Sequence, residues 1–183
     1  MGIWSTKDIK EYYVLVKPIL QSAEFKKRKD FLHHQDSVYD HCLRVSLKGY
    51  RIAKKLKWKN KEESLKNVAV AGLLHDFYDK PWRETNLDPR FFKKHGFTHA
   101  KEACKNAYVY FPLLMNPVIE DSIVKHMFPL NRALPKYKES VIITCSDKIV
   151  SFEVFLHPKE LLRYLGAKED PIKKIKRLIK KDE

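Results

Sequence analysis

The sequence predicts one all-α domain of about seven to nine helices, and three observations support this prediction. Apolar residues recur at spacings of three and four along much of the chain, which is the pattern of helices with one buried face. No stretch of useful length alternates between apolar and polar residues, as a half-buried strand would. The 183 residues include only 5 Gly, with 44% hydrophobic and 33% charged residues, which is typical of a compact helical domain. A chain of this length fits one domain with a core that needs no cross-links.

Prolines and charge clusters divide the chain into helical segments. The segment SVYDHCLRVSLKGYRIAKKL is one of the clearest, because Val38, Cys42 and Val45 recur at helical spacing. The stretch PWRETNLDP is expected to form turns, and Thr98 is expected to be the N-cap of the helix that follows. Helices are expected over residues 6–21, 37–56, 62–75, 99–110, 118–127 and 139–156, with short helices near Pro158 and Pro171.

The formal net charge is +14, and basic residues are concentrated at 48–61 and in KKIKRLIKK near the end of the sequence. A field of this sign raises the local concentration of polyanions, and phosphates are the expected ligands. Lysine-rich helix faces are also ordinary solvated surface. The charge therefore supports a phosphorylated ligand without selecting one.

Two further features concern the cellular compartment and the state of the cysteines. No segment approaches the roughly 18 apolar residues needed to cross a bilayer, and the stretch MGIWSTKDIKEYY lacks an apolar signal core, so we expect a cytoplasmic protein outside the membrane. The three cysteines, Cys42, Cys104 and Cys145, are far apart and form no C-x-x-C pair. We expect reduced core thiols rather than disulfides or a thiolate zinc site. The oligomeric state stays open.

Histidines and aspartates interrupt the apolar faces of several predicted helices. His41 shares the inward face of its helix, and the pair His75-Asp76 ends the apolar run VAVAGLL. Asp147 lies within SVIITCSDKIVSFEVF, the most apolar predicted helix, where an unpaired carboxylate would be costly to bury. Each residue taken singly has an ordinary explanation, such as a hydrogen-bonded core histidine or a carboxylate paired with a lysine.

Two more histidines follow the same pattern. His126 follows Ile119 and Ile123 at helical spacing, and His99 opens the helix predicted over 99–110. A core that buries four imidazoles and two carboxylates must desolvate each of them unless something unites them. A divalent metal does so, because nitrogen and carboxylate oxygen suit first-row transition ions and a carboxylate can bridge two of them.

In their order along the chain, His41, His75-Asp76 and Asp147 resemble the H…HD…D signature of the HD-domain metal-dependent phosphohydrolase superfamily. The resemblance implies that these four side chains hold one metal. It covers residues 37–150.

The resemblance also extends to the second metal of the binuclear branch. His99 and His126 fall between the His-Asp pair and the last Asp, where that branch carries two additional histidines. This implies that Asp76 bridges to a second ion held by the two histidines, although one-metal members also exist. One or two divalent ions per chain are expected, and Fe, Mn, Co, Ni and Zn all accept such ligands.

The resemblance implies one HD domain over the whole sequence. The signature core would occupy 37–150, and the flanking segments 1–36 and 151–183 would be helical additions packed on it.

Three further residues are candidates for chemistry. Asp79 stands three after Asp76, where some one-metal members of the superfamily place an acid that acts on the attacking water. Lys80 stands four after Asp76, where similar bacterial hydrolases of diadenosine tetraphosphate have a lysine that would meet the substrate phosphate. Arg44, three after His41, could clamp a phosphate bidentately. The alternatives are a local ion pair for Asp79 and Lys80, and a salt bridge at the edge of the core for Arg44.

The resemblance implies a phosphohydrolase that uses metal-activated water on a nucleotide or another small phosphate ester or anhydride. The sequence HMFPLN after His126 has no His-Glu pair and no G-Y-P, so the cyclic-di-GMP phosphodiesterase branch is disfavoured. Two alternatives stay open. One is a nucleic-acid-binding or regulatory protein with a vestigial metal site, and the other is a di-iron oxygenase similar to inositol oxygenase.

Overall fold

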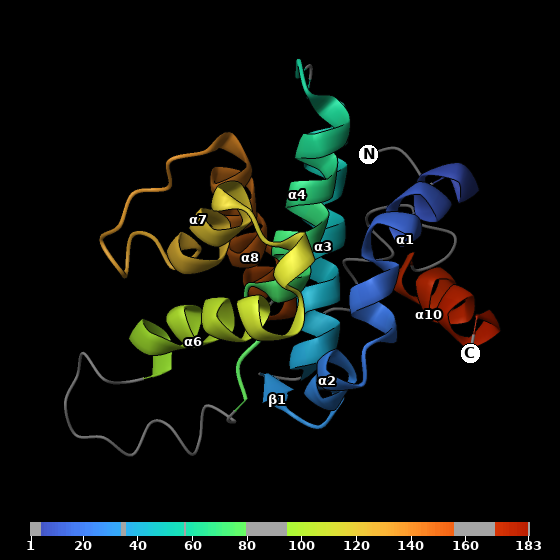
Figure 1. The fold of residues 1–183 in the computed structure, drawn as a ribbon, viewed down its shortest axis with the longest axis horizontal. Coiled ribbons are helices and arrows are strands. Elements are labelled where there is room, and N and C mark those ends of the chain that lie inside the picture. The colour runs from blue at the N-terminus through green and yellow to red at the C-terminus, as the bar shows by residue number, and fades with distance from the viewer. Residues whose placement is uncertain (1–4, 34–35, 57, 80–94, 156–170, 183) are drawn as a thin grey trace.

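Eight α-helices make up most of the part of the chain that the structure describes, which comprises residues 5–33, 36–56, 58–79, 95–155 and 171–182 of a computed structural model (Figure 1). The described residues also form two short 3₁₀ helices, η1 and η3, and two short strands, β1 and β2. The bounds are α1 Thr6–Gln21, α2 Ala23–Lys26, η1 Lys27–Lys29, β1 Leu32–His33, β2 Asp36–Ser37, α3 Val38–Lys55, α4 Lys61–Leu74, α6 His95–Tyr110, η3 Pro112–Leu114, α7 Pro117–Lys125, α8 Lys138–Phe155 and α10 Pro171–Lys181.

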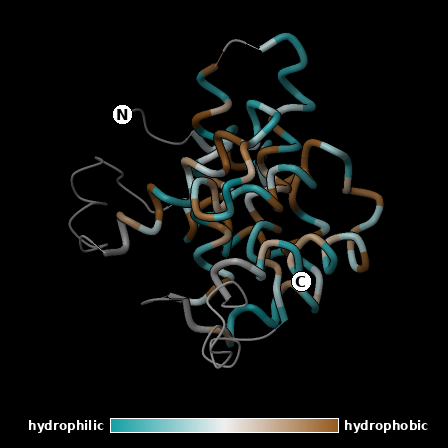
Figure 2. The backbone as a smooth tube through the Cα atoms, turned by 90° about the vertical axis from the view of Figure 1, so that its left-hand side faces the viewer, coloured by the Kyte–Doolittle hydropathy of each residue, from teal (hydrophilic) through white to brown (hydrophobic). Residues whose placement is uncertain are grey.

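The helices α3 and α4 form the centre of the fold (Figure 1). The helices α1 and α10 pack together on one side, while α6, α7 and α8 lie on the other. Figure 2 shows hydrophobic residues alternating with hydrophilic ones along the helices, as expected of elements that bury one face. The predicted all-α fold is confirmed.

The close approach of α3 and α4 depends on small residues. A Cβ atom added to Gly72 on α4 would lie 2.5 Å from the Cα atom of Ser46 on α3, and one added to Gly49 would lie 2.9 Å from Val68. The Ser46 hydroxyl donates to the Ala69 carbonyl oxygen at 2.6 Å, so the contact is satisfied as well as tight. This packing fixes how the two helices present their histidines.

The helix starts follow local capping chemistry. Ser37 precedes α3 and accepts a hydrogen bond from the Asp40 backbone N–H, and Asn116 accepts from the backbone N–H groups of Val118 and Ile119 at the start of α7. Ser5 and Asp8 form a reciprocal capping box at the start of α1. These caps explain the starts of α1, α3 and α7, each of which falls within one residue of its predicted start.

Several predictions were wrong in detail. The helix expected from residue 99 begins at His95, so Thr98 is inside it and is not its N-cap. A capping preference is worth only about 1 kcal/mol, which wider packing readily outweighs. Cys42 and Cys104 are buried free thiols, but Cys145 is exposed because it lies on the outer face of α8. The two-residue strands β1 and β2 pair antiparallel and are too short to produce an alternating pattern.

Other predictions fall outside the described residues. These are the turns expected at 81–89, the short helix expected near Pro158, and the site residue Lys80. The helix near Pro171 spans 11 residues, and the proline at its first position is compatible with a helix start. Among the residues that the structure describes, no helix combines the length and the apolar character needed to cross a bilayer.

Candidate metal centre

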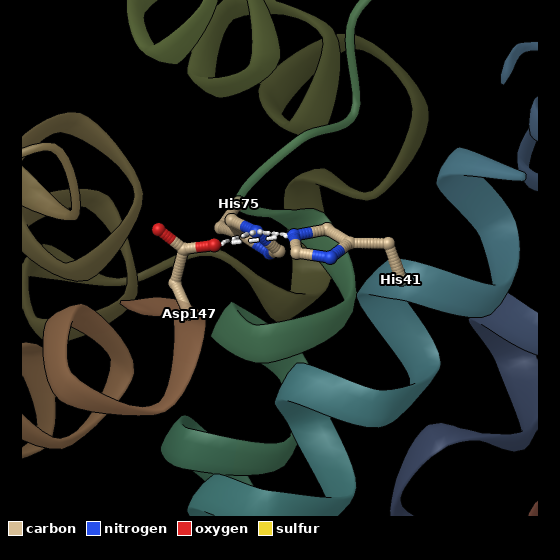
Figure 3. A group of neighbouring side chains, drawn as sticks. All are labelled: His41, His75 and Asp147. Carbon is tan, nitrogen blue, oxygen red and sulfur yellow. Dashed lines mark hydrogen bonds and ion pairs between the residues drawn. The ribbon is translucent and has the colours of Figure 1, made fainter. Parts of the chain in front are cut away.

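Three side chains from distant parts of the sequence meet at the middle of the fold (Figure 3). His41 lies on α3, His75 directly follows α4 and Asp147 lies on α8. The Nε2 atom of His41 is 3.1 Å from Asp147 Oδ1 and 3.3 Å from His75 Nε2. His75 Nε2 is 3.7 Å from the same Asp147 oxygen. We call these three residues the inner group.

Two more histidines meet close by. His99 on α6 and His126 at the end of α7 bring their Nε2 atoms within 3.1 Å of each other. The ring of His126 packs edge-on against the ring of His75, with 4.9 Å between centroids. We call His99 and His126 the outer pair.

Asp76 lies between the two sets and presents a different oxygen to each. Its Oδ2 atom is 3.6 Å from His75 Nε2 and 3.8 Å from His41 Nε2. Its Oδ1 atom is 3.3 Å from His99 Nε2 and 3.5 Å from His126 Nε2. One carboxylate therefore faces both sets of imidazoles, as a bridging ligand would.

Helix ends orient two of the imidazoles. The helix α4 stops just before His75, whose Nδ1–H donates to the Gly72 carbonyl oxygen at 2.9 Å. The helix α7 stops just before His126, whose Nδ1–H donates to the Ile123 carbonyl oxygen at 2.7 Å. Each ring satisfies a carbonyl of a last helical turn and directs Nε2 toward the centre.

The spacing of these atoms fits a divalent metal. Two ligand atoms about 2.1 Å from one ion, at an angle of about 90 to 110°, lie about 3.0 to 3.4 Å apart. The closest pairs of the inner group and the outer pair have this separation. Among the described residues, no donor hydrogen-bonds to the buried Oδ1 atom of Asp76, which a metal would satisfy.

Two overlapping sets of side chains could hold an ion. One comprises His41, His75 and Asp147, and the other comprises His75, Asp76 and His126. Imidazole nitrogen with carboxylate oxygen is a donor set that first-row transition ions accept.

The two carboxylates are held in the ionised form. Burial alone would raise the pKa of Asp76, but His75 and His99 hold it well below its usual range. Burial would also raise the pKa of Asp147, but hydrogen bonds from His41 and His75 hold this pKa well below the usual range. The centre therefore concentrates negative charge that a cation can neutralise.

The histidines differ in their affinity for a proton. Burial lowers the pKa of His75, but the neighbouring Asp76 outweighs burial and places the pKa well above the usual value. Burial, with the charge of His75, lowers the pKa of His126 to about 4. His126 is thus a neutral ligand at pH 7, whereas His75 must release a proton when a metal binds.

Asp79 is engaged in a network that the sequence did not reveal. The Arg28 guanidinium, only 1% exposed, lies 2.6 Å from Asp79 Oδ1. The Asn106 amide donates to Asp79 Oδ2 at 3.0 Å, and the Asp79 backbone N–H donates to Glu102 at 3.1 Å. The partner of Asp79 is thus the distant Arg28 and not a neighbour in the loop, and the proposed role of Asp79 toward water stays a prediction.

A periodic signal could have revealed part of this network. His99, Glu102 and Asn106 follow at spacings of three and four along α6, so they share one face. Nothing local marks Arg28, because the basic run KKRK is typical of solvated surface. Nothing local marks Lys148 either, which lies in an apolar stretch and donates to the His126 carbonyl oxygen at 3.1 Å.

Arg44 lies on α3, one turn after His41, and is partly buried. Its predicted contact with a substrate phosphate stays a prediction.

The family model of the HD domain matches residues 38–179, which is more than half of the chain. The chain belongs to the HD domain family. The match includes all six clustered residues of the candidate centre. No curated protein and no solved structure matches the chain. The family, together with the clustered histidines and aspartates, points to the metal-dependent phosphohydrolase superfamily.

Proposed function

We propose that the protein is a phosphohydrolase that uses metal-activated water on a nucleotide or another small phosphate ester or anhydride. The observation that carries the proposal is the position of Asp76, whose two oxygens face two separate sets of histidines. This arrangement suits two metal ions that share one carboxylate ligand.

The six clustered side chains divide the proposed ligand roles. His41, His75 and Asp147, with Asp76 Oδ2, would hold one ion. His99 and His126, with Asp76 Oδ1, would hold the other. When bound, divalent metals supply an acidified water and positive charge for the phosphoryl oxygens.

Residues around the centre would act on water and substrate. Asp79 is proposed to accept the proton of the attacking water, and Arg28 and Asn106 would hold its carboxylate in place. Lys80 and Arg44 are proposed to meet the substrate phosphate as cations. A lysine at position 80 also makes dinucleoside polyphosphates candidate substrates.

We also propose that residues 1–183 form one HD domain. Packing of α1 on α4 and of α10 on α1 supports this proposal, because both outer helices bury apolar faces against the signature core or each other. The family match extends into α10.

An activity screen tests the proposed function. Protein reconstituted with Mn²⁺, Fe²⁺, Co²⁺, Ni²⁺ or Zn²⁺ is assayed for phosphate or nucleotide release from nucleotides, dinucleoside polyphosphates and simple phosphate esters. We expect metal-dependent hydrolysis that is lost in Asp147→Ala and kept in Asp40→Asn, which changes a carboxylate on α3 that pairs with Lys176 instead. Metal-dependent oxygen consumption without hydrolysis would favour the oxygenase alternative, and strongly salt-dependent oligonucleotide binding without hydrolysis the nucleic-acid alternative.

A further inference from the structure

A cavity of about 270 Å³ lies at the amino-terminal ends of α4, α7 and α8. Asn67 on α4, Val118 on α7 and Glu139 on α8 contribute to its lining. Asn67 and Glu139 lie eight residues before His75 and Asp147, respectively, which is about 12 Å along each helix axis. The cavity is therefore separate from the metal centre, although helices that carry the centre also build the cavity.

Two buried polar side chains face this cavity with hydrogen-bonding capacity to spare. Asn67, 3% exposed, accepts from Asn116 through Oδ1, and no acceptor among the described residues takes its amide N–H groups. Glu139, 5% exposed, accepts from the Ser64 hydroxyl at 2.6 Å through Oε1, and its second oxygen has no donor in the same part of the chain. Neither atom is sealed inside the protein, so both open into the cavity. Buried polar atoms without partners are uncommon and call for a ligand or water.

Two lysines lie on the exposed side of the cavity. Lys59 and Lys138 are exposed there, and neither forms an ion pair with a carboxylate of the described residues. The Lys138 ammonium group lies over the Trp58 ring at 4.2 Å. Asn60 does not cap α4 with its side chain, so the positive end of that helix adds to the field. Glu63 on the exposed side and the buried Glu139 are the opposing charges of the lining.

We propose that this cavity binds a small organic anion whose other end carries hydrogen-bond donors. The anionic group would lie between Lys59 and Lys138, while donor groups reach Glu139 and an acceptor meets the Asn67 amide. A nucleoside monophosphate and an amino acid both present this chemistry. The volume lies just under the roughly 300 Å³ at which pockets for larger ligands begin, so a dinucleotide would not fit inside.

Calorimetric titration of the metal-loaded full chain tests the proposal. The probes for a nucleoside monophosphate are guanosine and adenosine monophosphates. The probes for an amino acid are glycine and L-glutamate. We expect saturable binding of at least one probe with a Kd of about 1 mM or tighter. That affinity should weaken about tenfold or more in Asn67→Ala and in Lys138→Ala, because each substitution removes one polar contact.

Two control variants locate the binding. Lys66→Ala removes an exposed lysine of α4 that does not line the cavity, and Asp147→Ala alters the metal centre. Lys66→Ala should bind the probe with wild-type affinity, and Asp147→Ala should keep the binding event that Lys138→Ala weakens, even where a nucleotide also binds the metal centre. Absence of saturable binding, loss of every binding event in Asp147→Ala, or unchanged affinity in Lys138→Ala would each overturn the proposal. Lys138 is exposed, so that variant decides the matter even where Asn67→Ala fails to fold. The outcome is independent of hydrolysis.

Discussion

The inner group and the outer pair are built on different parts of the fold. His41 and Asp147 come from α3 and α8, and His75 directly follows α4; these three helices pack on one another at the centre. His99 and His126 come from α6 and from the end of α7, a helix of only nine residues. The inner group is thus fixed by the core of the domain, whereas the outer pair depends on more peripheral packing.

The two sets also differ in charge. His75 has a raised pKa beside Asp76, whereas burial lowers the pKa of His126 to about 4. An ion at the inner group must compete with a proton on His75, but an ion at the outer pair meets no such competition from His126. Two similar ligand sets that share one carboxylate therefore need not bind metal under the same conditions.

The largest effect is expected for Asp76→Ala, because the two oxygens of Asp76 face the two sets. Loss of the shared carboxylate should remove both ions and lower kcat by at least about 10³-fold. Elemental analysis and the hydrolysis assay measure the two results. Hydrolysis near the wild-type rate in this variant would defeat the proposed mechanism.

Gly72→Ala should damage the inner group through packing. The added Cβ would lie 2.5 Å from the Ser46 backbone, so α3 and α4 must separate, at a cost of about 3 kcal/mol of unfolding free energy. Thermal or urea denaturation measures the loss, with Lys66→Ala on the exposed side of α4 as the control. A change below about 0.5 kcal/mol would show that the two helices do not pack this closely.

Lys80→Ala should leave both sets of ligands intact. Its proposed role is to meet the substrate phosphate, so metal content should be unchanged while kcat/KM falls about 10- to 100-fold, or about 1.4–2.8 kcal/mol. Metal loss in this variant would instead show that the lysine supports the centre.

A pH dependence of metal affinity should separate the two sets. In His126→Ala, which leaves the inner group, Mn²⁺ affinity should rise by up to about tenfold per pH unit above pH 6, because His75 must lose its proton. The rise should stop once pH exceeds the raised pKa of His75. In His41→Ala, which weakens the inner group, His126 should add no pH dependence over this range, since its pKa is about 4. Identical pH profiles for the two variants would contradict the electrostatic difference.

The sequence predicted the parts of the centre that carry a periodic signal. His41 and Asp147 interrupt apolar helix faces, and His75-Asp76 ends an apolar run, so their convergence followed from burying those faces. Their identity as metal ligands stays a prediction. The helices were predicted from the same periodicity.

Long-range contacts could not be predicted in this way. The ion pair of Arg28 with Asp79 joins residues 51 positions apart, and the sequence around neither residue indicates its partner. The early start of α6 and the free polar atoms of Asn67 also depend on packing between helices, which periodicity along one helix does not encode. A sequence pattern shows which face is buried but does not show what that face meets.

The number of metal ions per chain shows whether Asp76 joins two ion sites. Protein loaded with Mn²⁺ or Fe²⁺ is analysed for metal content as wild type, His99→Ala and His126→Ala. We expect two ions per wild-type chain, falling toward one in each variant while the inner group keeps its ion. A wild-type chain that never exceeds one ion would contradict the claim and leave His99 and His126 as pocket residues that contact substrate.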